Sequence, residues 1–185
     1  IVGVGIRAFV GHFGLRQISA PRQLIVFMLL NLSITIWLFG QGLGDFPRSE
    51  IAIRAGDVAF AITALLATAW FGVFPRLRER GIDRYVLMGG VAWAGLVVYA
   101  VMLVVAAVFV SDGELSLYQE GAIRHVFMLG FVIPLMVTMS HVVLARFGTG
   151  SLHWPRALAV AFVLVATAWP LRVFPALFSD APSDA

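Results

Sequence analysis

Residues 121–150 read GAIRHVFMLGFVIPLMVTMSHVVLARFGTG, a long apolar stretch that carries two histidines. A helix of about 20 apolar residues can cross the hydrocarbon core of a bilayer, and this stretch is long enough to do so. An imidazole in such a helix is costly to keep in lipid and usually faces a cavity, another helix or a cofactor. The stretch therefore predicts a transmembrane helix whose candidate functional residues are His125 and His141.

The composition of the whole chain is that of a membrane protein. Of its 185 residues, 61% are hydrophobic and only 12% are charged. Soluble domains are about half apolar and about a quarter charged. All 13 basic residues are arginines, and they lie at the ends of apolar segments rather than along one face. The lipid bilayer is therefore the expected partner, and nucleic acid is not.

Several kinds of site are excluded by what the sequence lacks. Cysteine is absent, which excludes disulfides, thiolate metal sites and covalently attached c-type haem. No Ser/His/Asp set, phosphate loop or HExxH motif occurs, so hydrolase and nucleotide-driven functions have no support, and no reaction can be assigned. A metal or haem would need His, Met, carboxylate or backbone ligands. Because the chain opens at Ile1 in apolar sequence, we expect a fragment of a longer protein.

The apolar segments predict an all-α fold, a single polytopic bundle of transmembrane helices. Loops with Pro, Gly and charged residues separate them, and residues 1–15 look like the end of a preceding helix or an interfacial piece. The five expected spans are 22–43, 56–74, 85–110, 120–145 and 155–178. Pro134 lies within the fourth and is expected to free a carbonyl and bend the helix.

Arginine placement predicts the orientation of these spans. The 75–84 loop holds four arginines and is expected to be cytoplasmic, whereas 111–119 holds none and is expected outside. The 44–54 loop, with two arginines on the outer side, is the discordant element. On this topology His125 lies toward the outer surface beside Arg124, with Arg172 of the fifth span at a similar depth.

His125, Arg124 and Arg172 form the first candidate site. An imidazole can serve as an axial ligand of haem, and guanidinium groups suit the haem propionates through charge-assisted hydrogen bonds. In the alternative interpretation, both arginines extend to the lipid headgroups and His125 bonds a neighbouring helix.

His141 belongs to the other end of the same helix. It follows His125 by 16 residues, about 24 Å along a helix axis, so the two cannot bind one metal together. His12 and His153 are expected at the depth of His141. With methionines nearby they could hold copper, which accepts imidazole and thioether ligands. The methionines considered as copper ligands are Met28, Met88 and Met139. In the alternative interpretation, these methionines only fill gaps in the membrane core.

Asp57 is an acidic residue at the expected start of the second span. An acid within the membrane can relay protons. An aspartate at a helix start more often caps the helix, and we favour the cap.

Four segments together resemble the NnrS family of bacterial polytopic membrane proteins. These are GVGIRAFVGHFGLR at 3–16, NLSITIWLFGQGL at 31–43, Arg124-His125 followed by MLGF at 128–131, and RFGTG at 146–150. The resemblance implies a piece from the carboxyl-terminal half of such a protein. The chain departs from the family pattern at Ser140-His141, where many relatives carry an arginine.

The resemblance implies a haem- and copper-containing inner-membrane protein of nitric oxide metabolism, denitrification or the nitrosative stress response. His125 is then the best single haem ligand, and His141 and His12 are metal-ligand candidates. The alternatives are a cofactor-free transporter half and a structural membrane subunit. Ionisable residues are nearly absent from 60–70, 92–106 and 129–138, which disfavours a transporter with a midplane site. The sequence leaves the oligomeric state open.

Overall fold

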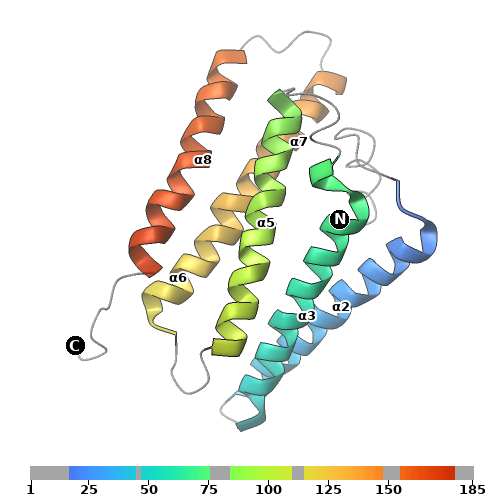
Figure 1. The fold of residues 1–185 in the computed structure, drawn as a ribbon, viewed down its shortest axis with the longest axis vertical. Coiled ribbons are helices and arrows are strands. Elements are labelled where there is room, and N and C mark those ends of the chain that lie inside the picture. The colour runs from blue at the N-terminus through green and yellow to red at the C-terminus, as the bar shows by residue number, and fades with distance from the viewer. Residues whose placement is uncertain (1–16, 45–46, 76–83, 110–114, 148–154, 178–185) are drawn as a thin grey trace. The chain divides into compact units, whose positions relative to one another are not determined.

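A computed structural model of the chain describes residues 17–44, 47–75, 84–109, 115–147 and 155–177 (Figure 1). Within these ranges every regular element is a helix, which confirms the predicted all-α fold. Five helical stretches are long and apolar enough to cross a membrane, as expected for a multi-pass membrane protein. They are Ala20–Gly42, Ser49–Pro75, Leu87–Val108, Leu117–Ser140 and Ala159–Leu177.

The helices divide between two compact units. The first unit contains α2 (Ala20–Gly42), α3 (Pro47–Phe71) and the second half of α5 (Arg84–Phe109). The second unit contains the first half of α5 and the fourth and fifth spans. Its remaining helices are α6 (Leu117–His125), the π-helix η1 (Val126–Val132), α7 (Ile133–Phe147) and α8 (Pro155–Leu177).

Glycines allow the close packing of α2 against α3 in the first unit, where the two helices lie side by side (Figure 1). A Cβ on Gly56 would stand 2.8 Å from the backbone nitrogen of Trp37, and one on Gly40 would stand 2.8 Å from the backbone nitrogen of Ile53. Small residues of this kind let helix backbones approach in membranes. Gly44 follows α2 with a φ of 58°, the left-handed conformation that glycine adopts after a helix end.

The start of α3 differs from the sequence prediction. The helix begins at Pro47, nine residues before the expected start of the second span at 56. Proline suits the first helical turn, and Glu50 bonds Arg54 one turn later at 2.5 Å. Polar residues that resemble a loop therefore form the first two turns. Asp57 lies inside the helix, and the prediction that it caps the helix start is wrong.

A capping box opens the fourth span at Ser116. The Ser116 hydroxyl accepts a hydrogen bond from the Gln119 backbone N–H at 3.3 Å, and the Gln119 side chain accepts one from the Ser116 N–H at 3.2 Å. This reciprocal pair satisfies two N–H groups at a helix start. The helix therefore begins at Leu117, three residues before the expected 120.

The middle of the fourth span is a π-helix rather than a continuous α-helix. Residues Val126–Val132 form η1, which ends one residue before the Ile133-Pro134 pair. Pro134 has no N–H to donate to the carbonyl of Gly130, four residues earlier. The irregularity that Pro134 predicts thus takes the form of a π-helical segment, a rare element that is frequent at functional sites.

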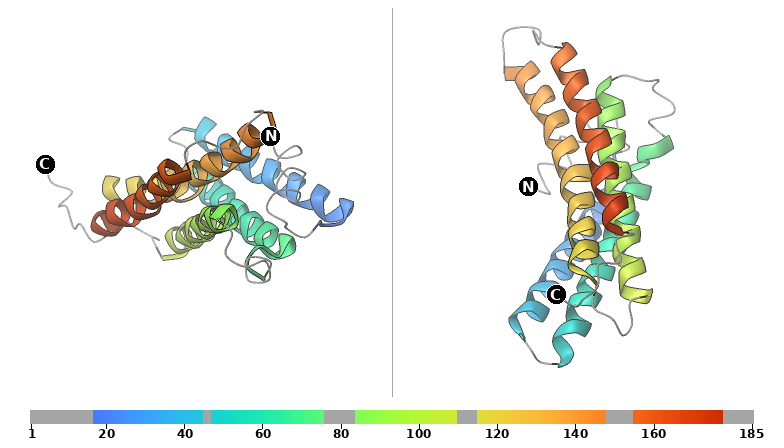
Figure 2. Two further views of the ribbon diagram at one scale, coloured as in Figure 1. Left: turned by 90° about the horizontal axis from the view of Figure 1, so that it is seen from above. Right: turned by 90° about the vertical axis from the view of Figure 1, so that its left-hand side faces the viewer.

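The π-helix packs against its neighbours through Gly130 in the second unit. A Cβ on Gly95 of α5 would overlap the carbonyl oxygen of Gly130. On the α8 side, a Cβ on Gly130 would stand 3.7 Å from the Trp169 ring. Trp93 of α5 packs on Phe131 with the ring centroids 6.5 Å apart. These contacts fix the depth of α5 and α8 relative to η1, and α8 runs beside the fourth span (Figure 2).

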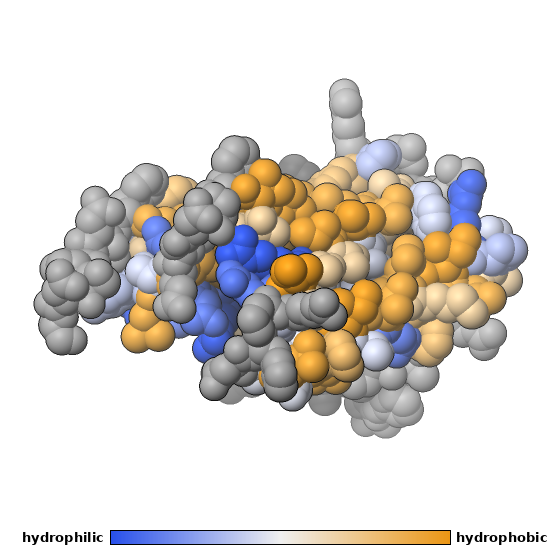
Figure 3. Space-filling model, turned by 90° about the horizontal axis from the view of Figure 1, so that it is seen from below, coloured by the Kyte–Doolittle hydropathy of each residue, from blue (hydrophilic) through white to orange (hydrophobic). Residues whose placement is uncertain are grey.

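Large apolar side chains cover the outer faces of the helices. Phe39 of α2 is 64% exposed and Leu171 of α8 is 75% exposed. In the view of Figure 3, hydrophobic residues cover much of the coloured surface, and hydrophilic residues form small clusters among them. Such a surface suits contact with lipid tails rather than with water.

Candidate functional site

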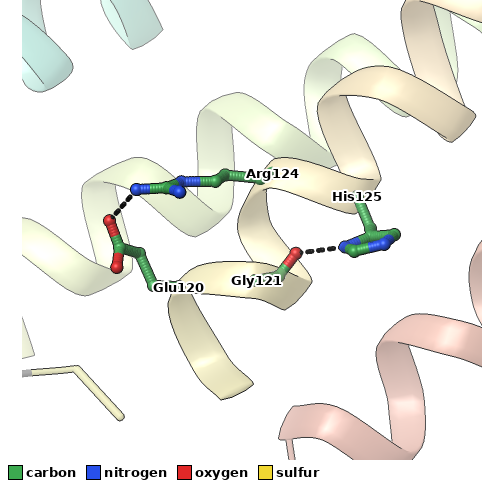
Figure 4. A network of polar contacts seen from close by, with 4 residues as sticks. All are labelled: Glu120, Gly121, Arg124 and His125. Carbon is green, nitrogen blue, oxygen red and sulfur yellow. Dashed lines mark hydrogen bonds and ion pairs between the residues drawn. The ribbon is translucent and has the colours of Figure 1, made fainter. Parts of the chain in front are cut away.

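His125 is the last residue of α6 and directly precedes the π-helix. Its side chain is half-buried, and its Nδ1 lies 2.6 Å from the backbone carbonyl oxygen of Gly121, one turn earlier (Figure 4). A carbonyl oxygen only accepts hydrogen bonds, so Nδ1 is the donor. In a neutral imidazole that bonds in this way, the lone pair lies on Nε2.

The Nδ1 hydrogen bond of His125 is of a kind that metal-binding histidines also make. Histidines that bind metals usually donate their second ring N–H to a carbonyl or carboxylate, which fixes the tautomer and the ring orientation. Among the residues that the structure describes, only Gly121 makes a hydrogen bond with this ring. Nε2 is therefore left with its lone pair available to a ligand.

Arg124 leaves α6 in a different direction from His125 and pairs with Glu120 (Figure 4). The Arg124 side chain is 73% exposed, and the two charged residues are four positions apart. This pair was not predicted from the sequence. The Glu-to-Arg spacing of four on a helix was the signal for it. A guanidinium group has five N–H donors, so Arg124 keeps donors beyond those that face Glu120.

Arg172 is exposed on α8, three residues after Trp169. Because the Trp169 ring lies against Gly130, α8 and the π-helix η1 reach the same depth at these two residues. α8 also contacts α6, which places the late part of α8 beside the start of the fourth span. Counting about 1.5 Å per residue from that level, Arg172 lies within about one helical turn of the depth of His125.

The second unit thus brings three of the five predicted site residues to one end: His125, Arg124 and Arg172. His141 lies in α7, about 24 Å farther along the span, and its side chain is outside the described part of the structure. His12 and His153 are also outside the described residues. Within the described ranges, no group of three or more His, Asp or Glu side chains could hold a metal ion.

The donors at His125 fit one axial position of a haem better than a copper centre. Haem takes four ligands from its own macrocycle, so one imidazole from this chain completes a fifth position. Copper takes several ligands from the protein, and the described residues hold no group of three His, Asp or Glu side chains around His125. Met88, one of the methionines considered for copper, is buried and lines a small apolar gap in the second unit. The other lining residues are Val91, Pro134, Val137, Ala161, Phe162, Val165 and Ala166.

Comparison with known proteins adds no family to this description. No protein-family model matches the chain, and neither a curated protein nor a solved structure matches it.

Proposed function

We propose that the chain is part of a haem-binding protein of the bacterial inner membrane that acts in nitric oxide metabolism or the nitrosative stress response. The resemblance of its motifs to the NnrS family supplies the biological role. The observation that carries the haem assignment is the hydrogen bond from His125 Nδ1 to the Gly121 carbonyl at 2.6 Å. It leaves Nε2 as the ligand atom.

The residues of the chain would hold the haem in a defined orientation. His125 would bind the iron through Nε2 while Gly121 fixes the plane of its ring. Arg172, which makes no ion pair with a described residue, would bind a propionate, and Arg124 would assist from its remaining donors. A bound haem iron supplies an open position for nitric oxide. Nitric oxide is small and apolar, so it can reach this position from the bilayer.

Copper is a weaker part of the proposal. The ligands proposed for it are His141 and His12, which lie outside the described side chains. A cofactor-free transporter half or a structural subunit is the alternative to the whole proposal. Both alternatives predict a colourless protein, so the cofactor content separates them from the proposal.

The test is the haem content of the purified, detergent-solubilised protein, measured as the pyridine haemochrome. We expect haem bound to the wild-type chain in a fixed ratio, and its loss from His125→Ala. Imidazole added to His125→Ala should restore binding, because it supplies the missing ligand. His141→Ala is the matched control, a histidine removed from the same span, and should keep its haem.

Two results would overturn the proposal. One is a folded wild-type protein, produced with ample haem, that contains none. The other is a His125→Ala protein that keeps the full haem content and an unchanged spectrum. Metal analysis of the same samples tests copper separately, because copper should fall in His141→Ala and not in His125→Ala.

A further inference from the structure

Asp57 is an acidic residue inside a membrane-spanning helix, and the proposed haem site does not use it. It lies in the span Ser49–Pro75, eight residues from its start, which is about 12 Å along the helix. Its side chain is half-buried. Acidic groups at such depth are costly, because the hydrocarbon cannot solvate their charge, and they usually have a function.

The nearest cation along the helix is engaged elsewhere. Arg54, one turn before Asp57, bonds the Glu50 carboxylate at 2.5 Å. Within the described ranges the Asp57 carboxyl makes no ion pair and no hydrogen bond. A fixed salt bridge therefore does not account for an aspartate at this position.

A phenol from a second helix lies near Asp57. Tyr99 of α5 packs edge-on against Phe60 with the ring centroids 5.9 Å apart. Phe60 follows Asp57 by three residues and thus lies on the same side of α3. The Asp57 carboxylate is close enough to act electrostatically on the Tyr99 phenol. All three residues belong to the first unit.

The other ionisable residues of α2 and α5 belong to other parts of these helices. On α2, which packs against α3 at Gly56, the ionisable residue is Arg22, and its guanidinium stacks on Trp70 at the other end of α3. On α5, Arg84 and Tyr85 lie at the start of the helix, in the second unit. Asp57 and Tyr99 are therefore the pair whose protonation matters here.

Glu50 and Arg54 connect this pair with the surface. Glu50, Arg54 and Asp57 follow the spacing i, i+4 and i+7, which places them along one face of α3. The Glu50 side chain is 68% exposed, and the Arg54 side chain is 32% exposed. Ionisable groups thus lead from the exposed start of the helix toward Asp57.

We propose that Asp57 is a proton-binding site within the membrane, with the Tyr99 phenol as its electrostatic neighbour and the Glu50 end of α3 as the route to water. A metal cation would need several oxygen ligands, and the described residues around Asp57 hold no group of three that could bind one. A proton needs only one carboxyl oxygen. Binding and release add or remove that proton alone, so no other reactant is needed. The site does not depend on haem.

Dicyclohexylcarbodiimide, an apolar reagent that modifies protonated carboxyl groups, tests the proposal. The full chain is placed in phosphatidylethanolamine–phosphatidylglycerol vesicles, treated between about pH 5.5 and about pH 9, and digested for mass spectrometry. We expect an adduct on Asp57 that forms more slowly as the pH rises. Glu50, exposed and paired with Arg54, should react several-fold more slowly with this reagent.

Two variants and a second reagent make the test specific. Asp57→Asn should lose the adduct, and Tyr99→Phe should keep it but shift the pH at which the labelling rate is half-maximal. A water-soluble carbodiimide should favour Glu50 over Asp57. The site proposal is overturned if the folded wild-type protein forms no Asp57 adduct, if its labelling rate does not depend on pH, or if the water-soluble reagent labels Asp57 faster. An unchanged pH midpoint in Tyr99→Phe would overturn the role of Tyr99.

Discussion

The carbonyl oxygen of Gly130 occupies the space where a Cβ on Gly95 would stand, so only a hydrogen atom fits there between α5 and the π-helix. Pro134 has no N–H to donate to that carbonyl, which faces the Cα–H of Gly95. The contact lies five residues after His125 on the same span. It therefore anchors the helix that carries the proposed ligand.

Replacing Gly95 by alanine is expected to destabilise the protein. The new methyl group would overlap the Gly130 backbone, which cannot rotate away as a side chain can, and overpacking of this kind costs about 1–3 kcal/mol. The measurement is thermal unfolding in detergent, followed by the fluorescence of the five tryptophans.

Gly121→Ala is the matched control for Gly95→Ala. A Cβ on Gly121 meets nothing within 4 Å, and alanine is the better helix former by up to about 1 kcal/mol. Its melting temperature should be equal to or above that of the wild type. A Gly95→Ala protein with the same melting temperature as Gly121→Ala would contradict the close contact between Gly95 and Gly130.

Gly56→Ala is expected to separate α2 from α3 in the first unit. The added Cβ would stand 2.8 Å from the backbone nitrogen of Trp37, and the cost should again be about 1–3 kcal/mol. Gly42→Ala, on the same helix pair but with nothing within 4 Å of the new Cβ, serves as the comparison. Equal melting temperatures for the two variants would show that the helices do not approach through Gly56.

Ser116→Ala is expected to weaken the start of the fourth span. It removes the hydroxyl that accepts the Gln119 N–H, and loss of such a cap costs about 1 kcal/mol. Ser116→Asp keeps an acceptor and should retain most of the stability. Thermal unfolding distinguishes the two, and an alanine variant as stable as the aspartate variant would argue against the capping box.

The spans could be predicted from the sequence because their hydropathy is strong, but their starts could not be placed as well. Polar residues such as Glu50 and Arg54 continue a helix beyond its apolar core. A span predicted from the length of its apolar segment does not include such residues. The same error misplaced Asp57 at a helix start. The Ser116-to-Gln119 spacing of a capping box was present in the sequence and could have placed the start of the fourth span.

The sequence singled out His125 but did not reveal the state of its ring. That state depends on which nitrogen faces the Gly121 carbonyl, which only the side-chain conformation shows. The extent of the π-helix could not be predicted from the sequence either. Pro134 indicates that the helix is irregular, but it does not determine which kind of irregularity forms. The place of Tyr99 near Asp57 could not be predicted either, because it arises from the tertiary contact of Tyr99 with Phe60.

Arg172 and Arg124 should contribute unequally to haem retention. Arg124 already pairs with Glu120, whereas Arg172 has no ion pair with a described residue. We expect Arg172→Gln to speed haem loss to excess apomyoglobin more than Arg124→Gln does. Neither change should alter the melting temperature much, because the exposed Arg124 pair contributes only about 0–1 kcal/mol and Arg172 makes no ion pair with a described residue. If both variants lose haem at the same rate as the wild type, the two arginines do not contribute to haem binding.

The most direct test of the central claim, that His125 is a haem ligand, is the reduced-minus-oxidised absorption spectrum of the purified protein beside that of His125→Ala. Our account predicts a haem Soret band in the wild type and its loss from a His125→Ala protein that still unfolds cooperatively. The same Soret band in both proteins, or its absence from a folded wild type made with ample haem, would contradict it.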